Sequence, residues 1–81
     1  MFIKKILEVP EILPYLEVRG LVKQYQKAKQ YLLLGHYSQV EFKLRKPKEQ
    51  GIYQFRINKQ FRAFGTIRDQ EMRIFTIDNH Q

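Results

Sequence analysis

The sequence predicts an α+β fold, with N-terminal helices packed on one face of a four-stranded antiparallel sheet. Apolar residues recur at helical spacing as far as Gly35, and they alternate with polar residues after position 40. The chain has 81 residues, which suffice for one domain, and 43% of them are hydrophobic, too many for a disordered chain. We therefore expect a single domain over 1–81, helical over 1–35 and a β-meander over 40–77.

The first part of the chain follows helical spacing in two segments. In MFIKKIL the apolar residues recur three to five positions apart, which predicts a short first helix. Pro10 and Pro14 then interrupt the pattern, so we expect a kink or short turn between Pro10 and Gly20. The apolar stripe is continuous over 21–34, and Gly35 follows as a helix terminator.

Four strands are expected in the second part, because each segment alternates polar and apolar residues. VEFKL (40–44) alternates strictly and is followed by the charged loop RKPKEQG. IYQFRI (52–57) and FRAFGTI (61–67) are joined by NKQ, which has the chemistry of a hairpin turn. EMRIFTI (71–77) is expected to be the last strand. Which of its faces is buried is ambiguous, because apolar residues fall on both faces.

The alternation leaves one sheet face uncovered by the helices. Arg56 and Arg62 flank a short turn on adjacent strands, so both are expected on this face. Like charges across a sheet cost at most about 1 kcal/mol, so the pair is either two ordinary solvent-facing residues or the centre of a phosphate site. The residues expected on this face are Lys43, Arg45, Gln54, Arg56, Arg62, Phe64 and Thr66.

The net charge of +7 suits either a solvated surface or a polyanionic partner such as RNA, DNA or an acidic protein. No cysteine is present, which excludes disulfides and thiolate metal sites and fits a reducing cytoplasm. No apolar run reaches about 18 residues and no signal-peptide core appears, so we expect a soluble protein without a membrane partner. Nucleotide-loop and zinc-protease motifs are absent.

The segment YQFRINKQFRAFGTIRDQEMRIFTIDNHQ carries an ordered set of features. An aromatic residue is followed by an RI pair, a polar turn, a ring-and-arginine pair, an acidic turn, an apolar strand and a polar end with histidine. This order and spacing resembles the C-terminal half of RelE/ParE-superfamily toxins of bacterial toxin–antitoxin systems. The similarity covers roughly residues 20–81, and it implies a RelE-like, microbial-ribonuclease-like fold.

The resemblance also implies a function. Members of the family either cut mRNA in the ribosomal A site or poison DNA gyrase, and each is neutralised by a co-expressed antitoxin. The RNA-cleaving members need no metal or other cofactor, because the RNA 2′-hydroxyl attacks the adjacent phosphate. We therefore expect an mRNA interferase, a ribosome-dependent endoribonuclease that inhibits translation, with the antitoxin, the ribosome and mRNA as partners. A gyrase-poisoning relative and a non-catalytic binding module are the alternatives.

Three residues match catalytic positions of the family. Arg56 matches its phosphate-binding arginine, and a guanidinium offers a planar two-pronged donor for the developing oxyanion. Arg62 matches a recurrent arginine, which in many members is structural and pairs with an acid. His80 occupies the acid/base position, where a pKa of about 6.5 suits proton transfer at neutral pH. An ordinary surface role remains the alternative for each.

Further residues are candidates for RNA binding. Phe64 shares the arginine face, where it either stacks a base or forms a second small core. Glu49 is a candidate base only because it lies near the basic loop. Four cations fall within six positions, where they either track an RNA backbone or form a solvated loop: Lys43, Arg45, Lys46 and Lys48.

Two departures from the family pattern are expected. The family opens with a strand before its first helix, whereas MFIKKIL is interpreted as helical. The sequence also stops at Gln81, before the segment that supplies a tyrosine or a helix in many members. We therefore expect a shortened member whose catalysis is in question. A missing first strand would leave an open sheet edge for a partner chain or for a homodimer.

Overall fold

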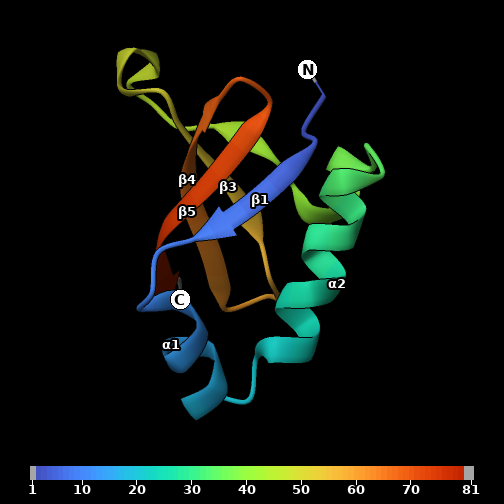
Figure 1. The fold of residues 1–81 in the computed structure, drawn as a ribbon, viewed down its shortest axis with the longest axis vertical. Helices are drawn as coiled ribbons and strands as arrows, with labels where there is room; N and C mark the ends of the chain where they lie inside the picture. The colour runs from blue at the N-terminus through green and yellow to red at the C-terminus, as the bar shows by residue number, and fades with distance from the viewer. Residues whose placement is uncertain (1, 80–81) are drawn as a thin grey trace.

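The computed structural model describes residues 2–79 and has an α+β fold of two helices and a five-stranded mixed sheet (Figure 1). The strand order is β1-β5-β4-β3-β2, with β1 parallel to β5 and all other neighbours antiparallel. The α+β class is thus confirmed, and the expectation of a four-stranded, wholly antiparallel sheet is wrong. The elements are β1 (Lys5–Glu8), α1 (Ile12–Val18), α2 (Val22–Leu33), the 3₁₀ turn η1 (Tyr37–Val40), β2 (Lys43–Leu44), the 3₁₀ turn η2 (Lys48–Gln50), β3 (Ile52–Arg56), β4 (Phe61–Arg68) and β5 (Glu71–Asn79).

The first segment is a strand, which corrects the expected helix over MFIKKIL. Residues of β1 pair with β5 from Lys5 opposite Glu71 to Glu8 opposite Ile74. A helix this short is marginal by itself, whereas pairing satisfies the backbone and buries Ile6 against the core. Because β1 covers the edge of β5, the open edge expected from a missing first strand is absent there.

A second correction concerns Pro14. We expected a kink or short turn between Pro10 and Gly20, whereas Pro14 lies inside the helix α1. It is the third residue of the helix, where a backbone N–H would have no acceptor within the helix. The helix buries Ile12 and Leu16, four residues apart on one face. Proline is therefore compatible with a short helix whose first turn needs no hydrogen bond at that position.

The second helix, α2, matches the expected apolar stripe and buries Tyr25, Ala28 and Leu32. It ends at Leu33 with Leu34 as the C-cap, and Gly35 follows with φ of +80°, the left-handed conformation that glycine adopts without strain. Within residues 2–79, no helix is both long enough and apolar enough to span a membrane.

The strand expected over 40–44 is shortened to two residues. Val40 belongs instead to η1 and is buried, and Glu41 follows in a left-handed conformation with φ of +50°. Phe42 then stacks on Tyr53, with ring centroids 5.4 Å apart. Only Lys43–Leu44 pairs with β3. Glu41 thus lies between η1 and β2.

A bulge resolves the ambiguous facing of the last strand. Phe64 lies opposite Thr76 and Gly65 opposite Ile74, so Phe75 is an extra residue in β5. The insertion lets both Ile74 and Ile77 face the core although they are three residues apart. A Cβ at Gly65 would lie 2.5 Å from a backbone oxygen of β5, so only glycine fits there.

The core lies between the helices and one sheet face. Figure 1 shows α2 running alongside the sheet and α1 lying across its lower end. Tyr25 of α2 stacks on Phe55 of β3 and Tyr15 of α1 meets Phe61 of β4, so both helices contact the same face. The largest fully buried side chains are Ile3, Leu16, Leu32, Phe55, Met72 and Ile74.

Candidate anion-binding site

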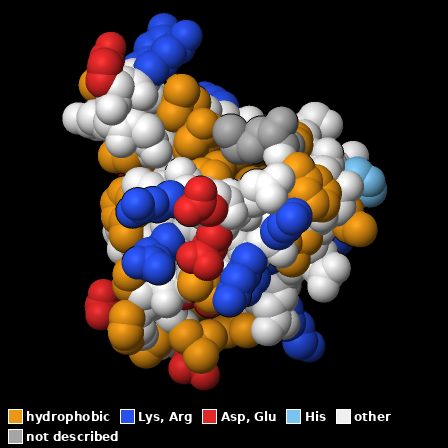
Figure 2. Space-filling model, turned by 45° about the horizontal axis from the view of Figure 1, so that its top comes forward, with side chains coloured by type: hydrophobic (Ala, Val, Ile, Leu, Met, Phe, Trp, Pro, Cys, Tyr) orange, Lys and Arg blue, Asp and Glu red, His pale blue; other side chains and the backbone are white. Residues whose placement is uncertain are grey.

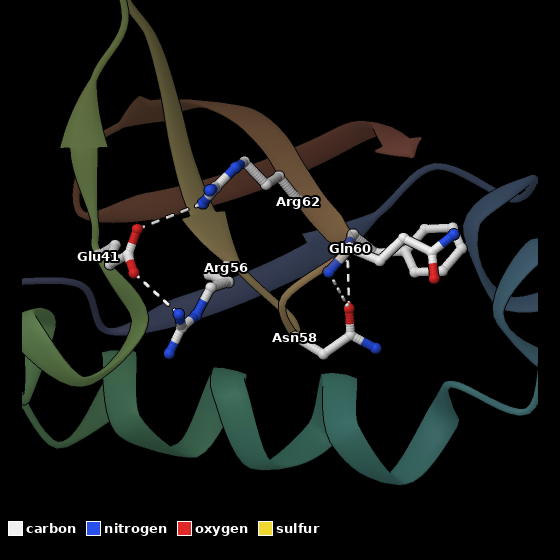
Figure 3. Close-up of polar contacts among 6 residues, drawn as sticks. Glu41, Arg56, Asn58, Gln60 and Arg62 are labelled. Carbon is white, nitrogen blue, oxygen red and sulfur yellow. Dashed lines mark hydrogen bonds and ion pairs between the residues drawn. The ribbon is translucent and has the colours of Figure 1, made fainter. Parts of the chain in front are cut away.

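Two arginines from neighbouring strands share one carboxylate. Arg56 ends β3, and Arg62 lies directly opposite it in β4. The carboxylate of Glu41 lies between the two guanidinium groups (Figure 3). Its Oε2 is 2.9 Å from Nη1 of Arg56, and its Oε1 is 3.5 Å from Nη1 of Arg62. We refer to Arg56 and Arg62 as the arginine pair.

The hairpin turn that aligns the pair is held by Asn58. Its Oδ1 accepts hydrogen bonds from the backbone N–H groups of Gln60 and Phe61, both at 2.8 Å (Figure 3). Its Nδ2 donates to Oε1 of Gln24 at 2.8 Å, which ties the turn to α2. The predicted hairpin turn over 58–60 is therefore confirmed, and it fixes the register that places the two arginines opposite each other.

The two arginines line different recesses, although the register puts both side chains on the sheet face opposite to that of Phe55, as the alternation predicts. Within residues 2–79 no strand pairs with the outer edge of β3 beyond Gln54, because β2 has only two residues. Arg56 lies past that point and lines a groove beside α2. Arg62 lines a hollow on the uncovered face. The pair therefore joins two recesses, with Glu41 at the junction.

The charge of the arginine pair is partly neutralised by Glu41. Arg56, Arg62 and Glu41 have side chains 37%, 19% and 47% exposed, so each ion pair contributes at most about 1 kcal/mol. One carboxylate against two guanidinium groups leaves one positive charge. The anion that the sequence led us to expect at this position is thus supplied by Glu41, and an external anion must share its place or replace it.

The hollow on the uncovered face has a volume of about 230 Å³. The guanidinium of Arg45 lies over the ring of Phe64, with its Cζ 4.7 Å from the ring centroid. Phe64 is only 6% exposed and lies outside the main core cluster. The ring of Phe64 is therefore largely covered in this structure, with Arg45 over it, and the choice between base stacking and a second small core stays open. The hollow is lined by Lys43, Arg45, Gln54, Arg62, Phe64 and Asp78.

The remaining candidates are not brought to the arginine pair. Lys46 and Lys48 lie in the exposed loop around η2, which projects from the sheet in Figure 1. Glu49 lies in the same turn, and none of the ion pairs among residues 2–79 includes it. His80 lies outside the described residues. Of the proposed RNA-binding cations, only Lys43 and Arg45 share a recess with Arg62.

Sequence reasoning missed Glu41 as a site residue. Alternation placed it on the polar face of the expected strand 40–44, where it is the only acid. That position was a usable signal, because an acid facing Lys43 and Arg45 is a natural partner for neighbouring cations. The pairing of Lys43 with Gln54 gives a second signal, because the same register continued by two residues places position 41 opposite Arg56.

The face of the molecule that Figure 2 shows is mixed in charge. In the view of Figure 2, Lys and Arg side chains lie beside Asp and Glu side chains instead of forming one uninterrupted positive patch. Among residues 2–79, no group of three or more His, Cys, Asp and Glu side chains is arranged to hold a metal ion. The arrangement is suited to holding one small anion between two guanidinium groups.

Comparison of the chain with models of protein families finds no match, and comparison with curated proteins finds none either. The resemblance to RelE/ParE toxins therefore rests on the sequence pattern over roughly residues 20–81, with its motif over 53–81.

Proposed function

We propose that the protein is a RelE/ParE-like toxin that cleaves mRNA on the ribosome and so inhibits translation. One observation carries the proposal: Arg56 and Arg62 hold the two oxygens of a single carboxylate. A phosphodiester also presents two charged oxygens, and it is the anion for which paired guanidinium groups are best suited. The motif over 53–81 supplies the family, and the arginine pair supplies the site.

The chemistry follows from a phosphate in the place of the Glu41 carboxylate. The RNA 2′-hydroxyl attacks the adjacent phosphorus, an O2′–P bond forms and the P–O5′ bond breaks. Negative charge grows on the phosphoryl oxygens as the pentavalent state forms, and two fixed guanidinium groups stabilise that charge. The 2′-hydroxyl proton must leave and the 5′-oxygen must gain one, and His80 is the proposed proton carrier on the strength of the resemblance.

The location of β1 supports the family assignment. A strand before the first helix is part of the family pattern, and β1 occupies that place. The remaining outer edges of the sheet belong to β1 and to the two-residue β2. These edges are where we propose that a second copy, or an antitoxin, pairs with the sheet. A ribosomal target also implies a cytoplasmic location.

The test is inducible expression in bacterial cells, with pulse labelling of protein and DNA synthesis. We expect the wild type to stop protein synthesis first, and an acidic antitoxin to restore growth. Arg56→Ala should lower the cleavage rate by about 10²–10³-fold, the usual cost of losing one donor to a developing oxyanion. Arg73→Ala is the matched control, because Arg73 is a strand arginine that is 62% exposed and far weaker in its pairing, at 3.7 Å from Glu71.

The other outcomes separate the alternatives. Collapse of DNA synthesis before protein synthesis identifies a gyrase poison and contradicts the nuclease. No toxicity at all identifies a non-catalytic binding module, which one observation favours: Glu41 already occupies the place of the phosphate. That module would bind RNA weakly and with a steep dependence on salt.

A further inference from the structure

A groove of about 350 Å³ runs between α2 and the turn that joins β3 to β4. Lys27 of α2 and Lys59 of the turn stand on its two sides, and Arg56 of the arginine pair lines it as well. We refer to this recess as the α2–turn groove. Among the described residues that line it, none is acidic, whereas the hollow beside Arg62 includes Asp78. The groove therefore attracts an anion more strongly than the hollow does.

The floor of the α2–turn groove is apolar. Ala28, Val40 and Ile57 are each less than a tenth exposed and form its base. Tyr31 adds an aromatic ring to the α2 side. Cations above an apolar and aromatic floor match a nucleotide, which carries charge on its phosphate and has a flat, weakly polar base.

The groove is fixed in width before any ligand binds. The hydrogen bond of 2.8 Å between Asn58 and Gln24 joins its two sides. The turn itself is held by the two bonds to Oδ1 of Asn58. A ligand therefore binds without first ordering the walls, which lowers the entropy lost on binding.

Continuity with the arginine pair decides which ligand fits. Arg56 both contacts the junction at Glu41 and lines the groove. A polymer with a phosphate at the arginine pair therefore has its next unit at the mouth of the groove. An acidic peptide would use the cations alone, whereas a nucleotide also uses the apolar floor and Tyr31.

We propose that the α2–turn groove binds the nucleotide of single-stranded RNA that lies next to the phosphate held by Arg56 and Arg62. Lys27 and Lys59 contact its phosphate, and its base lies over the floor against Tyr31. The proposal rests on the proposed function for the phosphate at the arginine pair. It assigns the two lysines to binding and gives them no part in the chemical step.

The test compares 2′-O-methyl oligouridylates of one and four nucleotides, which lack the attacking hydroxyl and cannot be cleaved. Titration calorimetry on the full chain gives each affinity. We expect Lys27→Gln/Lys59→Gln to weaken the tetranucleotide about tenfold and to leave the mononucleotide unchanged. The slope of log affinity against log salt should fall by about 0.7, since the two lysines neutralise one phosphate of a single strand.

The matched control is Lys4→Gln/Lys5→Gln, which removes the same charge at exposed positions at and next to β1. The sheet order places β1 at the edge farthest from β2 and β3. The control should bind both oligonucleotides as the wild type does. A tetranucleotide with one abasic position tests the base contact: the wild type should bind it more weakly than the intact one, and Tyr31→Leu should abolish that difference.

Each failure has its own signature. If the lysine variant and its control weaken tetranucleotide binding equally, the groove is not the binding site. Mononucleotide binding that depends on Arg56 would still support the arginine pair as the phosphate site. Mononucleotide binding unchanged in Arg56→Ala/Arg62→Ala overturns the proposed function itself. Binding of hexaglutamate that requires Lys27 and Lys59, without tetranucleotide binding, overturns the RNA assignment in favour of an acidic protein ligand.

Discussion

Glu41 is the residue that occupies the arginine pair and so controls its affinity for other anions. Strand pairing puts two guanidinium groups opposite each other, at a cost of a few tenths of a kcal/mol to about 1 kcal/mol. The two ion pairs of Glu41 contribute a stabilising free energy of similar size. Because these contributions nearly cancel, the carboxylate matters little for stability and much for the affinity of the pair for other anions.

We therefore predict that Glu41→Gln lowers the free energy of unfolding by less than about 1 kcal/mol. The same change should raise the affinity for inorganic phosphate about fivefold, the factor that corresponds to about 1 kcal/mol of removed competition. Phosphate titration followed by NMR of the arginine Nε–H groups measures the affinity. Glu17→Gln, at an exposed position of α1, is the control. A lower affinity in Glu41→Gln would contradict competition and give Glu41 a part in binding the ligand.

Among the elements, the hairpin between β4 and β5 is the one whose turn conflicts with its sequence. Asp69 and Gln70 have φ of +51° and +66°, so both central residues are left-handed, as in a type I′ turn. Aspartate tolerates this conformation, but glutamine adopts it with strain. The pairing of β4 with β5 over eight registered pairs holds the turn in place.

Gln70→Gly should therefore stabilise the protein by about 0.5–1 kcal/mol, because glycine reaches positive φ without a Cβ clash. Urea unfolding measures the change. Gln60→Gly makes the same substitution in the other hairpin turn, where glutamine is not among the residues with positive φ. It should destabilise or leave stability unchanged. Equal effects of the two substitutions would show that strain at Gln70 is absent.

At the scale of the whole molecule, Tyr25 connects its own helix α2 with the strands β1 and β3. Its hydroxyl donates to Oε2 of Glu8 in β1 at 2.7 Å, and its ring stacks on Phe55 of β3. Lys29 also contacts the same Glu8 oxygen at 2.9 Å. Burial raises the pKa of Tyr25 far above its ordinary value, and the hydrogen bond to Glu8 and the charge of Glu8 raise it further.

This shift predicts alkaline destabilisation. The folded protein keeps the Tyr25 proton, whereas the unfolded chain loses it above a pKa of about 10. The stabilisation is therefore complete below about pH 10 and declines above it, by up to about 1.4 kcal/mol per pH unit. Tyr25→Phe should cost about 1–2 kcal/mol at neutral pH and flatten the alkaline decline. Urea unfolding from pH 8 to 11, compared with Tyr31→Phe, isolates the contribution of Tyr25, and an unchanged slope would contradict it.

Features that depend on residues close together in the chain could be predicted before the structure was known. The stripe over 21–34 and Gly35 gave the extent of α2, and NKQ gave the hairpin turn. Together with the alternation of β3 and β4, that turn put Arg56 opposite Arg62. Helical periodicity and turn chemistry act over a few residues, so these parts of the fold and of the candidate site were open to prediction.

The other features depend on contacts between segments that are far apart in the chain. A segment as short as β1 takes its conformation from the strand it meets, and that partner is more than sixty residues away. The bulge at Phe75 is defined by the pairing of β5 with β4, and the contact between Glu41 and Arg62 joins the segment before β2 to β4. These are contacts between distant segments, whose free energy exists only once the chain has packed, and a local pattern carries no record of them.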